Sequence, residues 1–249
     1  MKLNFICISD KGYRRTENQD SYWAAGYTKS NGCPERGISG TADSNTFFAV
    51  FDGMGGLSQG GTASEISARA FDEFVRSVKP CSDADFNRLC FSMNEKVCEY
   101  MEKNKIGAMG STFAAAYFDD GGAHICNIGD SSVFRFAQGN LKQLTVEHIG
   151  RDFGNGKPGL TQFIGIPKED FVIEPHITSL KCRVGDRFLL CTDGLTDMVS
   201  RIELVKILGG SDGLSDTAQK LKSSALNNGG IDNITFVLIE VVDGGKEND

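Results

Sequence analysis

The sequence lacks a long apolar segment and any excess of positive charge, and each absence excludes a class of protein. Its longest unbroken apolar run is Phe113 to Phe118, far short of the roughly 20 residues that a membrane-spanning helix needs. The N-terminal apolar run, Phe5 to Ile8, ends in polar residues, so we expect no signal peptide. With 26 Lys and Arg against 33 Asp and Glu, the net charge of −7 opposes binding to nucleic acid and to anionic membranes.

No two of the eight cysteines have the C-x-x-C spacing of zinc ribbons or thioredoxin-like sites. Cys7, Cys126 and Cys191 lie inside apolar runs, where a free cysteine behaves as a small core residue. We therefore expect reduced thiols and a cytoplasmic protein. The histidines have no metal-ligand spacing, and we expect surface or strand-edge positions for all three: His124, His148 and His176.

Glycine is abundant, at 30 of 249 residues, and clusters without a fixed period at apparent turns. Many short strands joined by tight turns would need such glycines. Short runs rich in Phe, Val and Ile predict strands at Asn4–Ser9, Asp20–Ala25, Thr46–Phe51, Ser111–Phe118, Ala123–Ile128, Ser131–Ala137, Phe188–Thr192 and Ile234–Val242.

Apolar residues at helical spacing predict three helices, at Thr62–Val78, Asp83–Lys103 and Asp212–Leu226. Ser82 with Asp85 predicts a capping box at the start of the second of these helices. The resulting order is strands, two adjacent helices, many strands, helices and a strand. Such segregation is typical of the α+β class with an antiparallel core, and not of alternating βα units.

The length suits one domain, which we expect to span residues 1–243. Two segments are predicted to be irregular because they mix glycine with polar residues: 27–45 and 146–180. The second is long for a loop, which is a property of functional loops. Residues 244–249 are expected to form a disordered tail.

Carboxylates border the predicted strands. Asp52, Asp130 and Asp193 each follow an apolar run, and Asp20 and Asp232 each precede one. A sheet can bring such residues close together, which is costly unless a cation or proton compensates the charges. Mg²⁺ and Mn²⁺ prefer oxygen ligands, so a metal site is one interpretation. Asp-Gly is also a common turn pair, and each pair alone is more often a turn.

Arg15 lies five residues before Asp20, where its guanidinium could face a metal-held phosphate. Arg14 and Lys11 lie nearby, and on the local sequence alone a solvated surface arginine is the simpler interpretation.

Six segments have a family pattern when they are taken together and in order. They are Ser9–Asp20, Val50–Gly56, Gly110–Thr112, Ile128–Ser131, Leu189–Leu195 and Asp232–Thr235. This set resembles the motifs of the metal-dependent Ser/Thr protein phosphatases of the PPM (type 2C) family, across residues 4–242. The Arg-x-x-Asn-Gln-Asp segment and the Met after Asp-Gly resemble the bacterial branch.

The resemblance implies a four-layer α-β-β-α sandwich of two antiparallel sheets flanked by helix pairs. It also implies a centre of two Mn²⁺ or Mg²⁺ ions. In that centre Asp52 would bridge both ions, the Gly53 carbonyl would bind one of them, and Asp193 and Asp232 would hold the other. Asp130 with Asp193 matches the ligands of a third, weaker ion in bacterial members.

The same resemblance implies that Asp20 binds metal-bound water and that Arg15 grips the substrate phosphate. The implied reaction is hydrolysis of phosphoserine and phosphothreonine by a metal-activated water, without a covalent phosphoenzyme. The implied partners are phosphorylated proteins, the substrates of a cognate Ser/Thr kinase, and we expect a monomer.

The sequence departs from the family pattern at several positions. Gln19 stands where many members have Glu, and Met54 where animal members have a proton-donating His. Ser132 stands where Arg is usual, with Arg135 as a candidate substitute. We assign no catalytic role to Thr112. The segment at about 146–180 is shorter than the usual flap, so substrate preference is the property that transfers least.

Two alternatives remain. Gly56–Gly60 matches the G-x-S-x-G elbow of α/β-hydrolases, with Ser58 as nucleophile and His148 or His176 as base. The consecutive strands predicted over residues 111–137 disfavour that fold. The other alternative is a pseudophosphatase or phosphoprotein-binding adaptor with the same fold, which the presence of all four core metal positions disfavours.

Overall fold

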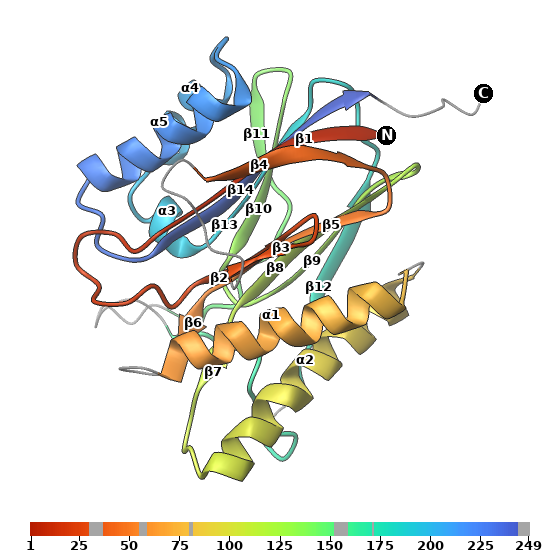
Figure 1. Cartoon of the computed structure of the whole chain (residues 1–249), viewed down its shortest axis with the longest axis vertical. Helices are drawn as coiled ribbons and strands as arrows, with labels where there is room; N and C mark the ends of the chain where they lie inside the picture. The colour runs from red at the N-terminus through yellow and green to blue at the C-terminus, as the bar shows by residue number, and fades with distance from the viewer. Residues whose placement is uncertain (30–36, 55–58, 80–81, 152–158, 171, 244–249) are drawn as a thin grey trace.

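In the computed structural model, two antiparallel six-stranded sheets are stacked between two layers of helices (Figure 1). The structure describes residues 1–29, 37–54, 59–79, 82–151, 159–170 and 172–243. The predicted four-layer α+β sandwich is confirmed.

The first sheet has the order β11-β10-β13-β14-β1-β4, and the second has the order β12-β9-β8-β5-β2-β3. The strands of the first sheet are β1 (Lys2–Asp10), β4 (Ile38–Asp43), β10 (Ser132–Ala137), β11 (Asn140–Gln143), β13 (Arg187–Cys191) and β14 (Ile234–Asp243). Those of the second are β2 (Ser21–Ala24), β3 (Tyr27–Thr28), β5 (Thr46–Phe51), β8 (Phe113–Asp119), β9 (Gly122–Ile128) and β12 (His176–Leu180). A short ribbon pairs β6 (Gly53–Met54) with β7 (Gly110–Ser111).

Each sheet has its own helical cover. The helices α1 (Gln59–Ser77) and α2 (Asp83–Asn104) pack on the second sheet, below it in Figure 1. The first sheet is covered by α3 (Asp193–Thr196), α4 (Arg201–Leu208) and α5 (Leu214–Asn227). A third apolar cluster fills the space between the two sheets. None of the described helices combines the length and apolarity that crossing a bilayer requires.

The strand β5 shows why the central strands are apolar on both faces. Successive side chains of a strand point to opposite sides. Phe47, Ala49 and Phe51 therefore join the cluster beneath α1 and α2, while Phe48 and Val50 join the cluster between the sheets. A strand buried on both faces reads as a continuous apolar run, which is why the sequence predicts this element at its observed bounds.

Two segments predicted to be irregular contain strands. The segment 27–45 includes β3 and β4, and the segment 146–180 ends in β12. Both β4 and β12 are edge strands that expose one face, so their polar residues hide the apolar pattern: Ile38 and Ala42 of β4 alternate with mostly exposed neighbours. The short helix α4 was not predicted either.

The predicted capping box at α2 is also wrong. The Ser82 hydroxyl donates to the Asp85 carboxylate at 3.0 Å and makes no bond to a helix N–H. Cys7, Cys126 and Cys191 are buried free thiols, as predicted. The expected tail, residues 244–249, lies outside the described residues.

Candidate metal centre

The predicted acidic residues lie where several strands end or begin at the same edge of the sandwich. Asp52 follows β5, and Asp193 opens α3 two residues after β13 ends. Asp20 directly precedes β2, whose Ser21 pairs with Phe51 at the end of β5. In the first sheet, β1 ends at Asp10 opposite Ile234, where β14 begins. Antiparallel pairing therefore brings segments far apart in sequence to one edge.

Asp20 is the most deeply buried of these carboxylates, at 1% exposure. One oxygen, Oδ2, accepts a hydrogen bond from Thr192 Oγ1 at 3.0 Å, whereas Oδ1 is buried without a partner among the described residues. Burial raises the pKa of Asp20 to about 7, despite hydrogen bonds from Thr235 and Thr192 that lower it. A buried oxygen without a partner is rare in proteins, and it points to a missing water or ion.

Asp52 and Asp193 form a close pair of like charges. Burial raises the pKa of Asp52 well above its usual range, and the charges of Asp20, Asp193 and Asp130 raise it further. The Asp193 carboxyl also lies within hydrogen-bonding range of Asp52. Carboxylates held this close favour either a shared proton or a bound cation. The structure thus brings together Asp20, Asp52, Asp130 and Asp193, and the charge of the fifth predicted acidic residue, Asp232, also raises the pKa of Asp20.

The fifth, Asp232, contacts Arg15. The Arg15 Nη2 donates to Asp232 Oδ2 at 2.6 Å, and the pair is exposed on one side. This bond raises the pKa of the guanidinium, and the charges of Asp52 and Asp193 raise it further. Arg15 is therefore an exposed arginine that borders the acidic cluster and pairs with one of its members.

The residues present fit a hard divalent cation, although the described side chains do not form a complete set of ligands around one position. In the part of the chain that the structure describes, no three His, Cys, Asp or Glu side chains are already arranged around a common ion position. The atoms of the cluster that could bind a metal are nevertheless carboxylate and carbonyl oxygens, the preferred ligands of Mg²⁺ and Mn²⁺. The unpaired Asp20 Oδ1 gives such a site an unsatisfied acceptor.

Gly53 must be a glycine for packing reasons. A Cβ at this position would lie 2.1 Å from the Gly60 carbonyl oxygen and 2.6 Å from that of Gln19. This close approach fixes the backbone at the end of β5 and at the start of α1. The Gly53 carbonyl therefore lies directly after Asp52, in backbone that the main chains of Gly60 and Gln19 hold in place.

Two asparagines that we did not predict hold the loop before β2. Asn233 accepts the Gln19 N–H at 2.8 Å and donates to the carbonyls of Lys11 and Glu17, at 2.9 Å each. Asn18 accepts the Asp20 N–H at 3.1 Å. Asn18 stands two residues before Asp20 and Asn233 directly follows Asp232, and this proximity to predicted site residues was the available signal.

Thr112 bonds to the backbone of Asp52, and Ser131 bonds to Thr112. The Asp52 N–H donates to Thr112 Oγ1 at 3.0 Å, and the Thr112 N–H donates to the Asp52 carbonyl at 2.9 Å. The Thr112 and Ser131 hydroxyls lie 2.6 Å apart, and both residues are buried. Thr112 therefore positions Asp52 through its backbone, a role that the motif alone did not indicate.

Other candidates lie elsewhere or have other partners. Arg135 forms an ion pair with Asp186 at 2.6 Å, at the start of β13 and away from Asp193, so it does not replace the family arginine. His148 Nδ1 accepts the Gly129 N–H at 3.1 Å, and burial lowers the pKa of this histidine. Ser58 lies outside the described residues. The two antiparallel sheets exclude the α/β-hydrolase fold.

Comparison with known sequences identifies relatives over nearly the whole chain. A family model described as protein phosphatase 2C matches residues 36–223. The Ser/Thr protein phosphatase PstP of Mycobacterium tuberculosis is 27% identical over 97% of this chain, which spans 45% of that protein's length. The Ser/Thr phosphatase stp of Listeria monocytogenes is 27% identical, with 93% of each chain covered.

Solved structures show the same similarity. The crystal structure of M. tuberculosis PstP/Ppp superposes with a TM-score of 0.80 at 25% identity, covering 98% of this chain and all of that one. The catalytic domain of PstP in complex with two manganese ions superposes with a TM-score of 0.77 at 26% identity, with the same coverage.

Proposed function

The chain belongs to the protein phosphatase 2C family, and from this premise we propose that it hydrolyses phosphoserine and phosphothreonine in proteins. The observation that carries the proposal is the convergence of Asp20, Asp52 and Asp193 at one edge of the sandwich, with Arg15 beside them. Cations compensate such a cluster, and the cluster and Arg15 together match the needs of phosphate-ester hydrolysis.

In this proposal Asp52, the Gly53 carbonyl, Asp193 and Asp232 hold two Mn²⁺ or Mg²⁺ ions, and Asp130 with Asp193 holds a third, weaker one. When bound, the ions supply a nucleophilic water at neutral pH and neutralise charge on the phosphoryl oxygens. The unpaired Oδ1 of the buried Asp20 would be available to accept a hydrogen bond from such a water. The reaction needs no covalent phosphoenzyme, because water is the nucleophile.

Arg15 binds the substrate in this proposal. Its guanidinium already holds a carboxylate at 2.6 Å and is exposed, and phosphate oxygens match the same fork of donors. Arg15 exchanges Asp232 for the phosphate, which leaves the Asp232 carboxylate available as a ligand. Met54 has no ionisable proton, so the leaving serine or threonine oxygen takes its proton from water.

Turnover of p-nitrophenyl phosphate in Mn²⁺, in Mg²⁺ and in EDTA tests the function. We expect hydrolysis with a divalent cation and none in EDTA, because the carboxylates alone cannot activate water. No turnover with any cation would contradict the proposal. Tight binding of a phosphopeptide without turnover would then support the alternative, a pseudophosphatase or phosphoprotein-binding adaptor.

We expect Arg15→Ala to raise KM for p-nitrophenyl phosphate about 10- to 100-fold, with a much smaller change in kcat. A charge-assisted hydrogen bond contributes roughly 1.5–3 kcal/mol, and the loss falls on binding because the cations still activate water. The Mn²⁺ concentration for half-maximal rate should not rise, since the change also frees Asp232. Arg14→Ala, at an exposed neighbour, is the matched control. An unchanged KM with a collapsed kcat would assign Arg15 a different role.

A further inference from the structure

A groove with a volume of about 580 Å³ runs between the second half of α2 and the segment 167–169. Met101 is buried, Ile106 packs partly against the core, and Pro167 is half-buried, so the groove has an apolar floor. Its lining includes none of the proposed metal ligands. The groove is thus separate from the candidate metal centre.

The rim of the groove is strongly acidic. It carries four glutamates, at positions 95, 99, 102 and 169, against a single lysine, Lys168. Lys168 pairs with Glu95 at 3.1 Å, and Lys96 of α2 pairs with Glu99 at 3.1 Å. Across the described chain, no cation is found paired with Glu102 or Glu169. Within the described residues, the rim therefore has two glutamates without an ion pair above an apolar floor.

The backbone directly before the segment 167–169 is anchored to α2. The buried Asn94 side chain accepts the N–H groups of Gly165 and Ile166, at 2.7 and 3.0 Å, and donates to the Ile166 carbonyl at 2.9 Å. Gly165 has a φ of +112°, and a Cβ there would lie 2.5 Å from the Met109 carbonyl. This anchor restrains one end of the segment 167–169, which lowers the entropy cost of ordering it when a partner binds.

Backbone pairing connects the chain before the segment 167–169 to Gly53, which directly follows Asp52. Ile164 exchanges two backbone hydrogen bonds with Ser111 of β7, at 2.9 and 2.8 Å. Ser111 in turn pairs with Gly53 of β6. Figure 1 shows the chain running from the end of α2 to β7, beside β6. Pro167 of the groove therefore lies three positions along the chain from Ile164, which is bonded to the β6–β7 ribbon.

We propose that this groove docks a segment of the protein substrate in which lysine or arginine stands beside apolar residues. The proposal rests on the proposed phosphatase function. Basic side chains complement the rim, and apolar side chains cover the floor. The protein has a net charge of −7 and repels an anionic phosphoprotein, and a basic docking segment offsets that repulsion. Phe91, 42% exposed and four residues before Glu95 on the same helix face, extends the apolar contact.

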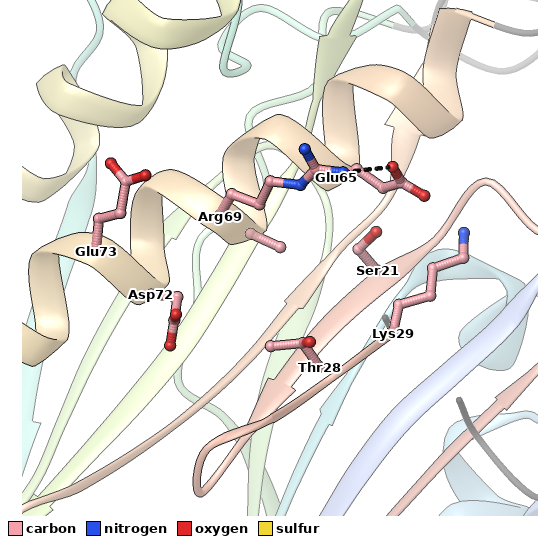
Figure 2. A pocket seen from close by; sticks show the side chains of 8 residues that line it. Ser21, Thr28, Lys29, Glu65, Arg69, Asp72 and Glu73 are labelled. Atoms are coloured by element: carbon pink, nitrogen blue, oxygen red, sulfur yellow. Dashed lines mark hydrogen bonds and ion pairs between the residues drawn. The ribbon is translucent and has the colours of Figure 1, made fainter. Parts of the chain in front are cut away.

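A second pocket, lined by Lys29, Glu65, Arg69 and Asp72 (Figure 2), does not match such a segment as well. Its cations lie among its acids: Arg69 contacts Glu65 at 3.4 Å, and Asp72 accepts hydrogen bonds from Trp23 and Arg76. Lys29 is engaged with the Asn18 carbonyl at 2.5 Å. The charge complementarity that favours a basic segment is therefore a property of the groove on α2.

Binding of an unphosphorylated peptide tests the docking without relying on catalysis. The probe is a fluorescein-labelled peptide of about 12 residues that combines lysine with leucine, and its partner has glutamine in place of lysine. We expect the lysine peptide to bind more tightly, and Glu102→Gln with Glu169→Gln to weaken its binding about five- to tenfold. The matched control is Asp43→Asn with Asp243→Asn, an equal charge change at exposed positions of the first sheet. Equal weakening by both pairs, or by neither, overturns the proposal.

The second arm attaches phosphothreonine to each peptide through a flexible linker and measures its hydrolysis. We expect the two glutamine substitutions to raise KM for the lysine peptide, with kcat and the kinetics of p-nitrophenyl phosphate unchanged. The same rise for the glutamine peptide would overturn the proposal. If the wild type hydrolyses no phosphate ester, the proposed function fails. The binding arm, read from the fluorescence anisotropy of the labelled peptide, still decides whether the groove docks a basic segment.

Discussion

Asp193→Ala should lower kcat/KM for p-nitrophenyl phosphate at least about a thousandfold while the fold persists. This loss corresponds to about 4 kcal/mol of transition-state stabilisation. The side chain is placed to hold two cations in the proposal, and its pairing with Asp52 shows that it lies inside the acidic cluster. Removal of a carboxylate from this crowded site relieves repulsion, so we expect no loss of stability in the metal-free protein.

The measurement combines steady-state kinetics in saturating Mn²⁺ with circular dichroism and thermal unfolding. Asp216→Ala, which removes an exposed carboxylate of α5, is the matched control and should keep the wild-type rate. A near-normal rate for Asp193→Ala would remove this residue from the metal centre. Asp232→Ala should cause a comparable loss, because Arg15 cannot replace a ligand.

Without divalent cations, the protein should become less stable as the pH rises from 5 to 8. Burial raises the pKa of Asp20 to about 7 from 3.8, so the folded state binds a proton that the unfolded state releases. The stabilisation from that proton is complete below pH 3.8 and is lost as the pH passes about 7. Asp52 shifts in the same direction. For Asp20 alone the loss between pH 5 and 8 is about 3 kcal/mol, or roughly 5–10 °C in Tm for a domain of this size.

The prediction is tested by measuring the Tm of the metal-free protein at pH 5 and at pH 8. Asp20→Asn is the control, because an amide does not titrate and the dependence on pH should shrink. Added Mn²⁺ should raise Tm most at pH 8, where the carboxylates are ionised and bind cations best. A Tm of the metal-free protein that rises with pH would contradict the raised pKa of Asp20. A Tm that does not change when Mn²⁺ is added at pH 8 would contradict a metal site in the folded protein.

The strands and helices that can be predicted from the sequence are those buried on a regular face. The run Thr46–Phe51 matches β5 residue for residue, and the stripe predicted at Thr62–Val78 lies within three residues of the bounds of α1. The edge strands β4 and β12 escaped prediction because few of their residues are large and apolar; in β4 the face toward the core has Ile38, Gly40 and Ala42. Their presence depends on the hydrogen-bonding groups that β1 and β9 offer to a neighbouring chain segment.

The sequence by itself determined the fold class, the acidic residues beside the strands and the family resemblance, because these depend on residue type and local order. Only the tertiary structure decided which of those residues meet and in what state. In the folded chain Arg15 donates to Asp232, and one oxygen of the buried Asp20 has no partner among the described residues. Asn233 donates to the Lys11 carbonyl and so joins two segments that are far apart in the sequence. The physical reason is that burial, charge proximity and hydrogen-bond partners belong to the packed molecule. Residues such as Asp20 and Thr192, 172 positions apart along the chain, become neighbours only when the two sheets stack.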